Sequence, residues 1–285
     1  VDQMQRAHAK GCDVVVFTEL ALTTYFPRWY FEDEAELDAY FETEMPSAAT
    51  RPLFEEAEKL GIGFHLGYAE LFEDAGGKRR FNTAILVDRS GAIIHKYRKI
   101  HLPGRPEPDP GFDVQALEKR YFEVGDLGFP TVRAYGGVMG VSICNDRRWP
   151  ESYRVLALRG AEMIFIGYNT PSRPYWSDQD SPLSEFHNHL SMQAGAYQNC
   201  AWVIGVAKAG IEDGSGLIGG TCVIAPTGEI VARAATRDDE LITAGCDLDM
   251  AVPLKANLLN FAQHRKIEHY GLITQQAGVT PPPES

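Results

Sequence analysis

Short apolar runs alternate with longer amphipathic stretches along most of the chain. Five runs rich in β-branched or aliphatic residues have the length of buried strands, and polar or glycine-containing segments bound them: 13–17, 62–68, 138–143, 163–168 and 201–207. Three stretches between them follow the helical period: 48–60, 150–159 and 184–198. Gly61 follows the first of these and is typical of a helix C-cap. The alternation predicts an α/β fold.

Two further pairs of apolar runs flank turn sequences and predict β-hairpins. Arg-Ser-Gly separates 81–88 from 92–97, and Pro-Thr-Gly separates 221–225 from 229–234. Because hairpin strands are antiparallel, the β-structure is expected to be mixed. A last strand is expected at 242–247. Residues 102–114 contain four prolines and two glycines and are expected to form a loop.

No repeat, linker or composition break divides the chain. Residues 1–277 are therefore expected to form one domain with a mixed sheet or two sheets covered by helices. The proline-rich end, 278–285, is expected to be a flexible tail. Residues 1–10 have the pattern of the second half of an amphipathic helix, so we expect a first strand of the domain to be missing upstream of Val1.

Composition narrows the classes of function. The chain has 285 residues and a formal net charge of −12, which disfavours nucleic-acid phosphates and anionic lipid surfaces as partners. No apolar run approaches the roughly 18 residues of a membrane span. Five scattered cysteines without a C-x-x-C spacing argue against a disulfide framework and against a cysteine-ligated metal. We therefore expect a cytoplasmic protein.

Cys144 is the sharpest candidate for chemistry. It follows an apolar strand and precedes the helix predicted at 150–159 by only a few residues. A nucleophile on a tight strand-to-helix turn projects from the sheet edge, where backbone N–H groups can stabilise a thiolate or a developing oxyanion. The alternative is a buried packing cysteine, which is common in protein cores.

Two charged residues stand at suitable places for assisting a thiol. Glu19 lies at the carboxyl end of the first strand, where open α/β sheets gather ligands, and a buried carboxylate can act as a base. Lys99 ends the second hairpin strand and could stabilise an oxyanion. Taken singly, each residue is better explained by a solvated charge at the surface.

Other polar residues near Cys144 give weaker signals. Arg147 and Arg148 suggest capture of a substrate carboxylate, although usually only one of two neighbours faces a given pocket. A single histidine is more often a hydrogen-bonded structural residue than a catalyst, and this applies to His101, His187 and His189. No H-E-x-x-H pattern is present, so a metallohydrolase is a weak alternative and no metal site is expected.

Six segments, considered together, resemble the nitrilase, or carbon–nitrogen hydrolase, superfamily. They are VVVFTELALTTYFPRW, GGKRRFNTAILVD, HKYRKIHLPG, LEKRYFEVGDLGFP, GVSICNDRRWPES and CVIAPTGEIVA. Within the superfamily, CNDRRWPE followed by GYNTP is similar to N-carbamoyl-D-amino acid amidohydrolases, the D-carbamoylases. The likeness runs from Gly11 to about Ile273 without an evident large insertion.

The resemblance implies a Glu–Lys–Cys triad. Glu19 matches the general base, Lys99 the lysine that stabilises the oxyanion, and Cys144 the nucleophile. Glu118 matches a second active-site carboxylate that positions the lysine and the substrate. The implied fold is a four-layer α-β-β-α sandwich, nitrilase-like, without a metal or organic cofactor.

The resemblance also implies how a substrate is held. Arg147, Arg148 and Asn169 match positions near the bound substrate, the two arginines being suited to an α-carboxylate. Ala116 departs from the pattern, because related sequences carry a histidine there, and the side-chain preference of the site is expected to differ. Members of the family usually form homodimers or homotetramers.

The expected function is hydrolysis of the ureido C–N bond of N-carbamoyl-D-amino acids to the D-amino acid, ammonia and carbon dioxide. The preference for the D form comes from the resemblance alone. One alternative is another enzyme of the superfamily, such as an amidase, a β-ureidopropionase or a nitrilase. A different class of function is a non-catalytic binding or scaffold protein on the same fold.

Overall fold

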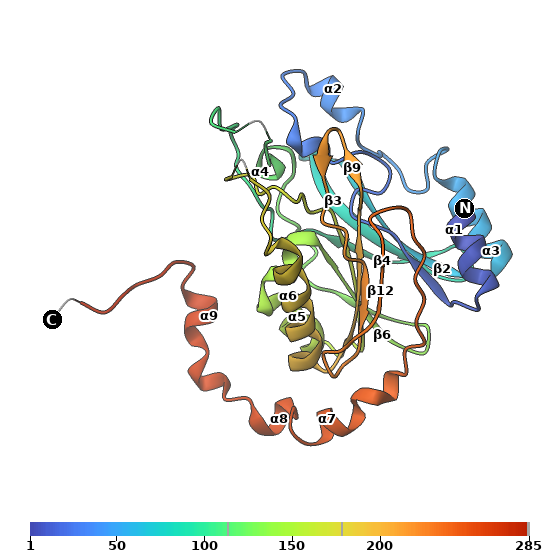
Figure 1. Ribbon diagram of the computed structural model, residues 1–285, viewed down its shortest axis with the longest axis vertical. Coiled ribbons are helices and arrows are strands. Elements are labelled where there is room, and N and C mark those ends of the chain that lie inside the picture. Colours follow the sequence, from blue (N-terminus) through green and yellow to red (C-terminus); the bar gives the residue numbers. More distant parts are fainter. Residues whose placement is uncertain (113, 178, 284–285) are drawn as a thin grey trace.

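Two β-sheets lie face to face at the centre of the molecule (Figure 1). The computed structural model describes residues 1–112, 114–177 and 179–283. The first sheet has the strand order β1-β2-β3-β4, in which β1 and β2 are parallel and the other pairs antiparallel. Its strands are Val14–Val16, Gly63–Asp74, Gly77–Val87 and Ile93–Arg98.

The second sheet has the strand order β12-β11-β8-β7-β6-β5. Its central strands β6, β7 and β8 are parallel, and antiparallel strands complete both edges. From β5 to β8 the strands are Thr131–Ala134, Gly137–Ile143, Met163–Tyr168 and Trp202–Ala207. The other two are β11, Cys222–Ile224, and β12, Ile230–Arg233, and a small separate hairpin is formed by β9, Ile211–Glu212, and β10, Ser215–Gly216.

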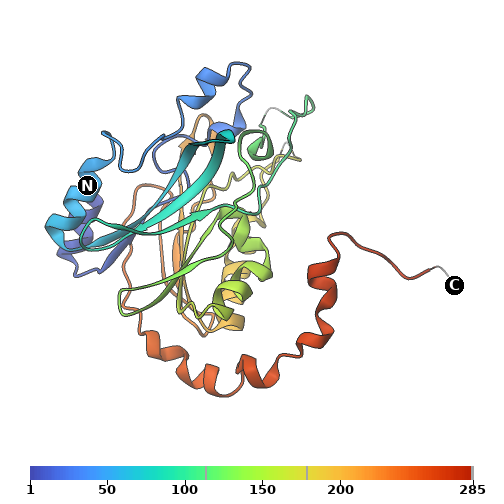
Figure 2. The same cartoon turned by 180° about the vertical axis from the view of Figure 1, so that it is seen from behind.

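One pair of helices covers the outer face of each sheet (Figure 2). Helices α1 (Asp2–Ala9) and α3 (Arg51–Leu60) pack on the first sheet through an apolar cluster that includes Met4, Phe54 and Phe64. Helices α5 (Pro150–Leu158) and α6 (Ser184–Asn199) pack on the second sheet through residues such as Leu156 and Met192. The layers therefore follow the order α-β-β-α, which confirms the predicted four-layer sandwich.

Short helical segments complete the chain. Those near the carboxyl ends of the central strands are η1 (Phe26–Arg28), α2 (Glu34–Asp38), α4 (Glu118–Tyr121) and η2 (Cys144–Arg148). The C-terminal arm consists of five short helical segments: η3 (Leu248–Ala251), α7 (Val252–Ala256), α8 (Phe261–His264), η4 (Ile267–His269) and α9 (Gly271–Gln275). The arm begins against the body, where Ala251 is buried and Arg154 of α5 lies over the Phe261 ring, and its later part stands away from the body (Figures 1 and 2). The last two residues of the tail predicted at 278–285 lie outside the described residues. No helix in the described ranges is long and apolar enough to span a membrane.

Most predicted elements are present, and the differences have a clear cause. Gly61 caps α3 with φ +64°, and both predicted hairpins form. The pairing of β2 with β3 is longer than expected and runs from Phe64 opposite Val87 to Asp74 opposite Gly77. The outer ends of these strands are polar and exposed, so their sequence lacks an apolar strand signal. Residues 102–112 and 114 form a loop as predicted, and Asp113 lies outside the described residues.

The strand predicted at 242–247 is not formed. The segment is extended, and Ile242 and Cys246 pack against the main core, but it makes no ladder with a neighbouring strand in the described structure. A groove of about 460 Å³ is lined by this segment together with Val14 and Val16 of β1. Because a strand is defined by its backbone partners, an apolar pattern alone does not produce one here.

Candidate active site

Cys144 occupies a strained turn at the carboxyl end of β6. Its φ is +46°, a region that non-glycine residues rarely adopt, and η2 begins at this residue. The side chain is only 4% exposed. Strain of this kind is maintained where the surrounding structure holds the backbone, and it is common at functional sites. The geometry resembles that of a nucleophile elbow, in which the turn presents the side chain at the end of the sheet.

Asp146 links this turn to the strand that precedes Lys99. Its buried carboxylate accepts hydrogen bonds from the Tyr97 hydroxyl at 2.8 Å and from the Ile143 N–H at 3.0 Å. It also accepts from the His101 N–H at 3.0 Å, and the His101 Nδ1 lies 2.7 Å from it. One carboxylate thus connects the residues on both sides of Lys99 with the turn that carries Cys144.

A buried charge cluster forms beside this turn. The Lys99 ammonium donates to Glu19 Oε1 at 2.7 Å and to Glu118 Oε2 at 2.6 Å, and all three side chains are fully buried. Asn82 Nδ2 donates to Glu19 Oε1 at 2.9 Å, and the Tyr25 hydroxyl donates to Glu118 Oε1 at 2.7 Å. Glu19 Oε2 has no partner among the described residues. This oxygen is a buried acceptor that could take a proton.

Burial and the neighbouring charges shift the pKa values of the cluster. Burial disfavours the charged ammonium, but the carboxylates of Glu118 and Glu19 outweigh it and raise the pKa of Lys99. Burial, together with the Glu19 charge, raises the pKa of Glu118 despite the ammonium. Burial also raises the pKa of the Cys144 thiol, and Glu19 raises it further, while Lys99 and Arg147 lower it. The resting cysteine is therefore a thiol that needs a base.

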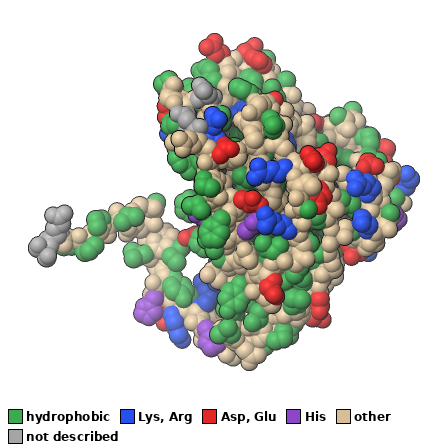
Figure 3. All heavy atoms as spheres, in the orientation of Figure 1, with side chains coloured by type: hydrophobic (Ala, Val, Ile, Leu, Met, Phe, Trp, Pro, Cys, Tyr) green, Lys and Arg blue, Asp and Glu red, His purple; other side chains and the backbone are tan. Residues whose placement is uncertain are grey.

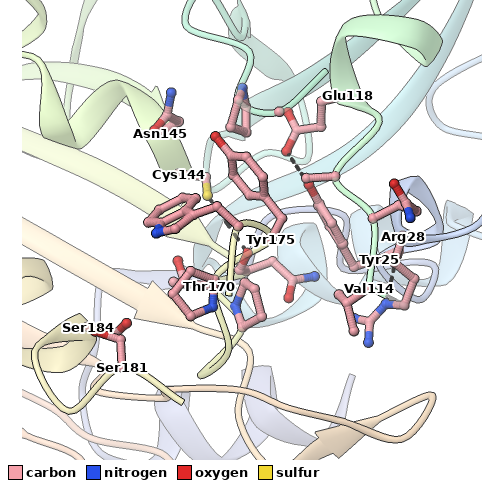
Figure 4. A pocket seen from close by; sticks show the side chains of 18 of the residues that line it. Tyr25, Arg28, Val114, Glu118, Cys144, Asn145, Thr170, Tyr175, Ser181 and Ser184 are labelled. Atoms are coloured by element: carbon pink, nitrogen blue, oxygen red, sulfur yellow. Dashed lines mark hydrogen bonds between the residues drawn. The ribbon is translucent and has the colours of Figure 1, made fainter. Parts of the chain in front are cut away.

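A cavity of about 690 Å³ opens over the cluster (Figure 4). Cys144, Glu118 and Tyr25 reach its wall, whereas Glu19 and Lys99 are fully buried next to them. Tyr175 and Trp176 contribute aromatic surface. Ala116 also lines the cavity, so its short side chain leaves room that a larger residue would fill.

The two neighbouring arginines point to different surroundings. Arg147 is buried and donates to Asn188 Oδ1 at 2.7 Å, to the Cys144 carbonyl at 2.7 Å and to Thr170 Oγ1 at 2.8 Å. Its guanidinium also lies over the Tyr168 ring. Arg148 lines the cavity and donates to Asn145 Oδ1 at 3.0 Å, and no carboxylate of the described residues pairs with it. Arg147 therefore supports the turn, while Arg148 can face a ligand.

Asn169 lies at the end of β7, next to the cysteine. Its carbonyl oxygen is 3.9 Å from the Cys144 sulfur, and the residue lines the cavity while being 3% exposed. Neither its side-chain oxygen nor its nitrogen has a partner among the described residues. A buried amide without partners costs free energy until a ligand satisfies it. Asn169 is thus suited to binding a polar group close to Cys144.

The three histidines to which the sequence assigned no role lie in different surroundings. His101 contacts Asp146 and stacks on Trp149, and the buried His189 contacts the Gly220 carbonyl through Nε2. His187 lines the cavity. Among residues 1–112, 114–177 and 179–283, no group of three or more His, Cys, Asp or Glu side chains could hold a metal ion.

Three residues that support the site were not among the candidates predicted from the sequence: Tyr25, Asn82 and Asp146. Each lies inside one of the segments that carry the family resemblance, so the sequence alone places them within the motifs. Their partners were not, because Asn82 is 63 residues from Glu19 and Tyr25 is 93 residues from Glu118. For Asn82 the available signal was a polar residue within an apolar strand, whereas Tyr25 and Asp146 lie in short segments outside the strands and gave no comparable signal.

A buried thiol beside a cluster of buried carboxylates and one ammonium, set in an α-β-β-α sandwich, is typical of a hydrolase of the nitrilase-like class. The chain belongs to the carbon–nitrogen hydrolase family, whose family model matches residues 1–256. It is therefore an enzyme of that family.

Known proteins agree with this assignment. An N-carbamoylputrescine amidase of Arabidopsis thaliana is 30% identical over 256 residues, covering 87% of this chain and 79% of the relative. A citrullinase of Francisella tularensis is 26% identical over 233 residues, covering 80% and 77%. The crystal structure of a carbon–nitrogen hydrolase from Helicobacter pylori has a TM-score of 0.82 at 24% identity and covers 96% of this chain and 91% of that one, which shows the shared fold.

The pKa shifts predict opposite effects of Glu19→Gln on two measurements. The carboxylate of Glu19 raises the pKa of Cys144, so its neutralisation should let the thiolate form at lower pH. Iodoacetamide should therefore label Cys144 faster at neutral pH in the variant, while turnover falls by at least 100-fold because the base is lost. The measurement is the labelling rate against pH, read by mass spectrometry. The exposed Glu151→Gln serves as a control, and slower labelling of Glu19→Gln would contradict the electrostatic coupling.

Proposed function

We propose that the enzyme hydrolyses the ureido C–N bond of N-carbamoyl-D-amino acids. The observation that carries the proposal is that Cys144, Asn169 and Arg148 line one cavity beside the Glu19–Lys99–Glu118 cluster. The Cys144 thiol can attack the carbonyl carbon of such a substrate. The amide of Asn169 can bind its ureido nitrogens, and the guanidinium of Arg148 can bind its carboxylate. The D preference is part of the proposal through the sequence resemblance.

The first half of the reaction forms a covalent intermediate. Glu19 Oε2 takes the Cys144 proton, and the sulfur attacks the ureido carbonyl carbon. The oxyanion accepts hydrogen bonds from the Lys99 ammonium and from a backbone N–H that follows Cys144. Glu19 returns its proton to the terminal nitrogen, the C–N bond breaks, and ammonia leaves. The carbamoyl group remains on the sulfur as a thioester-like adduct.

The second half releases the product. Glu19 takes a proton from a water molecule, and the resulting nucleophile attacks the carbonyl carbon of the adduct. The C–S bond breaks, and the thiolate recovers its proton from Glu19. The released N-carboxy amino acid then loses carbon dioxide and yields the free amino acid. Glu118 keeps its hydrogen bonds to Lys99 and Tyr25 through these steps and so positions the ammonium.

Substrate recognition in this proposal divides between two residues. The amide of Asn169 can accept from a ureido N–H and donate to a carbonyl, which satisfies both of its buried groups. The guanidinium of Arg148 can bind the α-carboxylate through two parallel hydrogen bonds. The adjacent Arg147 lowers the pKa of Arg148 to about 10, so the side chain remains a cation at neutral pH.

A second candidate substrate class is N-carbamoyl amines. Asp180 also lines the cavity, where it could attract a cationic group, although it accepts from the Ser172 hydroxyl at 3.1 Å. Two relatives, an N-carbamoylputrescine amidase and a citrullinase, are named after ureido compounds. These names support the ureido group as the common target and leave the charge of the remainder to experiment.

Ammonia release from a substrate panel tests this proposal. We expect N-carbamoyl-D-amino acids to be hydrolysed at least 100-fold faster than their L forms, N-carbamoylputrescine or simple amides. Cys144→Ala should release no ammonia because it lacks the nucleophile, whereas Cys246→Ala should remain active. Turnover of the panel by Cys144→Ala would refute the mechanism, and a preference for N-carbamoylputrescine would favour the second substrate class.

A neutral residue at position 148 should weaken binding of an anionic substrate. We expect Arg148→Gln to raise KM for N-carbamoyl amino acids by about 10- to 100-fold, since a hydrogen bond to a charged group contributes about 1.5–3 kcal/mol. KM for neutral amides should stay within about twofold. Steady-state kinetics on both classes gives the answer, with the exposed Arg159→Gln as the matched control. An equal rise for both classes would remove the carboxylate role.

We also propose that the chain forms a homodimer or homotetramer. Apolar side chains are exposed on α5 and α6 and along the C-terminal arm: Leu158, Phe186, Leu190, Tyr197, Leu258, Leu272 and Ile273. Figure 3 shows such side chains along the arm and over the neighbouring part of the body. Exposed apolar side chains gathered in this way are typical of a protein interface.

Light scattering after size exclusion tests the assembly. The wild-type chain should have at least twice the monomer mass, and Leu190→Asp should reduce that mass because it places a charge in the apolar surface of α6. Ile211→Asp, at an exposed position on β9 away from α5, α6 and the arm, should keep the wild-type mass. A monomeric wild-type protein at micromolar concentration would contradict the proposal.

A further inference from the structure

The backbone that carries Glu19 runs between the two sheets with a glycine on each side. A β-carbon added to Gly67 of β2 would lie 2.6 Å from the Thr18 carbonyl oxygen and 2.8 Å from the Glu19 Cα. A β-carbon added to Gly167 of β7 would lie 2.6 Å from the Glu19 nitrogen and 2.8 Å from the Thr18 carbonyl carbon. Both contacts are shorter than real β-carbons show.

Hydrogen bonds hold the same segment along β2. The Phe17 N–H donates to the His65 carbonyl at 3.0 Å, and the Ala21 N–H donates to the Gly67 carbonyl at 2.8 Å. Gly67 is paired with Ala84 in the first sheet, and Gly167 lies between Ile143 and Val206 in the second. Each glycine is therefore fixed within a sheet and cannot easily move away from the segment.

These contacts differ from that of the buried Gly205 because they involve backbone. A β-carbon at Gly205 of β8 would meet the Met192 sulfur at 2.6 Å, which is the flexible end of a side chain. A thioether can rotate out of the way. The peptide that joins Thr18 to Glu19 cannot rotate, because it is enclosed by both sheets. A glycine inside a strand often marks such a close approach of another backbone.

We propose that Gly67 and Gly167 are positioning residues that set the place of the Glu19 carboxylate from opposite sheets. The inference rests on the proposed role of Glu19 as the base. A methyl group at either position would displace the Glu19 backbone by a few tenths of an ångström or more. The hydrogen bonds from Lys99 and Asn82 to Oε1, at 2.7 and 2.9 Å, would lengthen, and Oε2 would move relative to Cys144.

The test compares Gly167→Ala and Gly67→Ala with the control Gly205→Ala. We expect kcat of the first two to fall about 10- to 100-fold with KM within about threefold, because misplacing a catalytic group by about 1 Å costs roughly 100-fold. Gly205→Ala should keep kcat near wild type.

Thermal unfolding separates positioning from stability. The proposal expects Gly167→Ala or Gly67→Ala to fold, with an unfolding midpoint similar to that of Gly205→Ala. If neither folds while Gly205→Ala does, or if all three variants have the same kcat, the two glycines act only as packing residues and the inference is wrong.

Crystal structures of the wild type and of the variants make the inference independent of the substrate. A lengthened distance between Glu19 Oε1 and Lys99 Nζ in Gly167→Ala, but not in Gly205→Ala, supports it even if the wild type hydrolyses nothing in the panel. In that case the proposed function fails and the positioning remains. If the distance between Glu19 Oε1 and Lys99 Nζ is unchanged in Gly167→Ala while the wild type hydrolyses the panel substrates, the positioning role is wrong. The proposed function then still stands.

Discussion

The site depends on the burial of one ammonium between two carboxylates. Lys99 is out of contact with solvent, and it can remain charged only because Glu19 and Glu118 accept hydrogen bonds from it at 2.7 and 2.6 Å. Removing one partner from such a group leaves an uncompensated charge in a medium that solvates it poorly. The loop after β1, the end of β4 and the start of α4 must therefore meet at one point, and the rest of the site is arranged around that meeting.

The two sheets provide the rigidity that this arrangement needs. The first sheet contributes Asn82, which fixes Glu19, and the second contributes the strained turn at Cys144. Asp146 connects the second sheet to the first through Tyr97 and His101. Catalytic geometry is thus set by contacts between layers. A side chain placed by two packed sheets is held more tightly than one placed by a single loop.

The cavity divides the charged residues near Cys144 into supporting and exposed groups. Arg147 is fully engaged with Asn188, Thr170 and the Cys144 carbonyl, so its charge supports the turn. Arg148 faces the cavity, where its charge is available to a ligand. Two adjacent residues of one type thus have different roles, because the short η2 helix directs successive side chains to different sides.

The sequence determined the fold class and the candidates for chemistry. Its apolar runs and helical periods predicted both hairpins, the α5 and α6 helices and the strands of the two sheets except the edge strand β5, since these signals are local. Membership in the superfamily followed from short motifs around Glu19, Lys99 and Cys144. The residues that match a site were therefore available without coordinates.

Only the tertiary structure decided what these residues touch. The apolar pattern at 242–247 could not reveal that the segment forms no ladder with the described strands, and the pair at 147 and 148 could not reveal which arginine faces the cavity. Hydrogen bonds such as that from Tyr25 to Glu118 join residues far apart in the chain. Local patterns report which face of an element is buried, whereas partners across layers depend on how the whole chain packs.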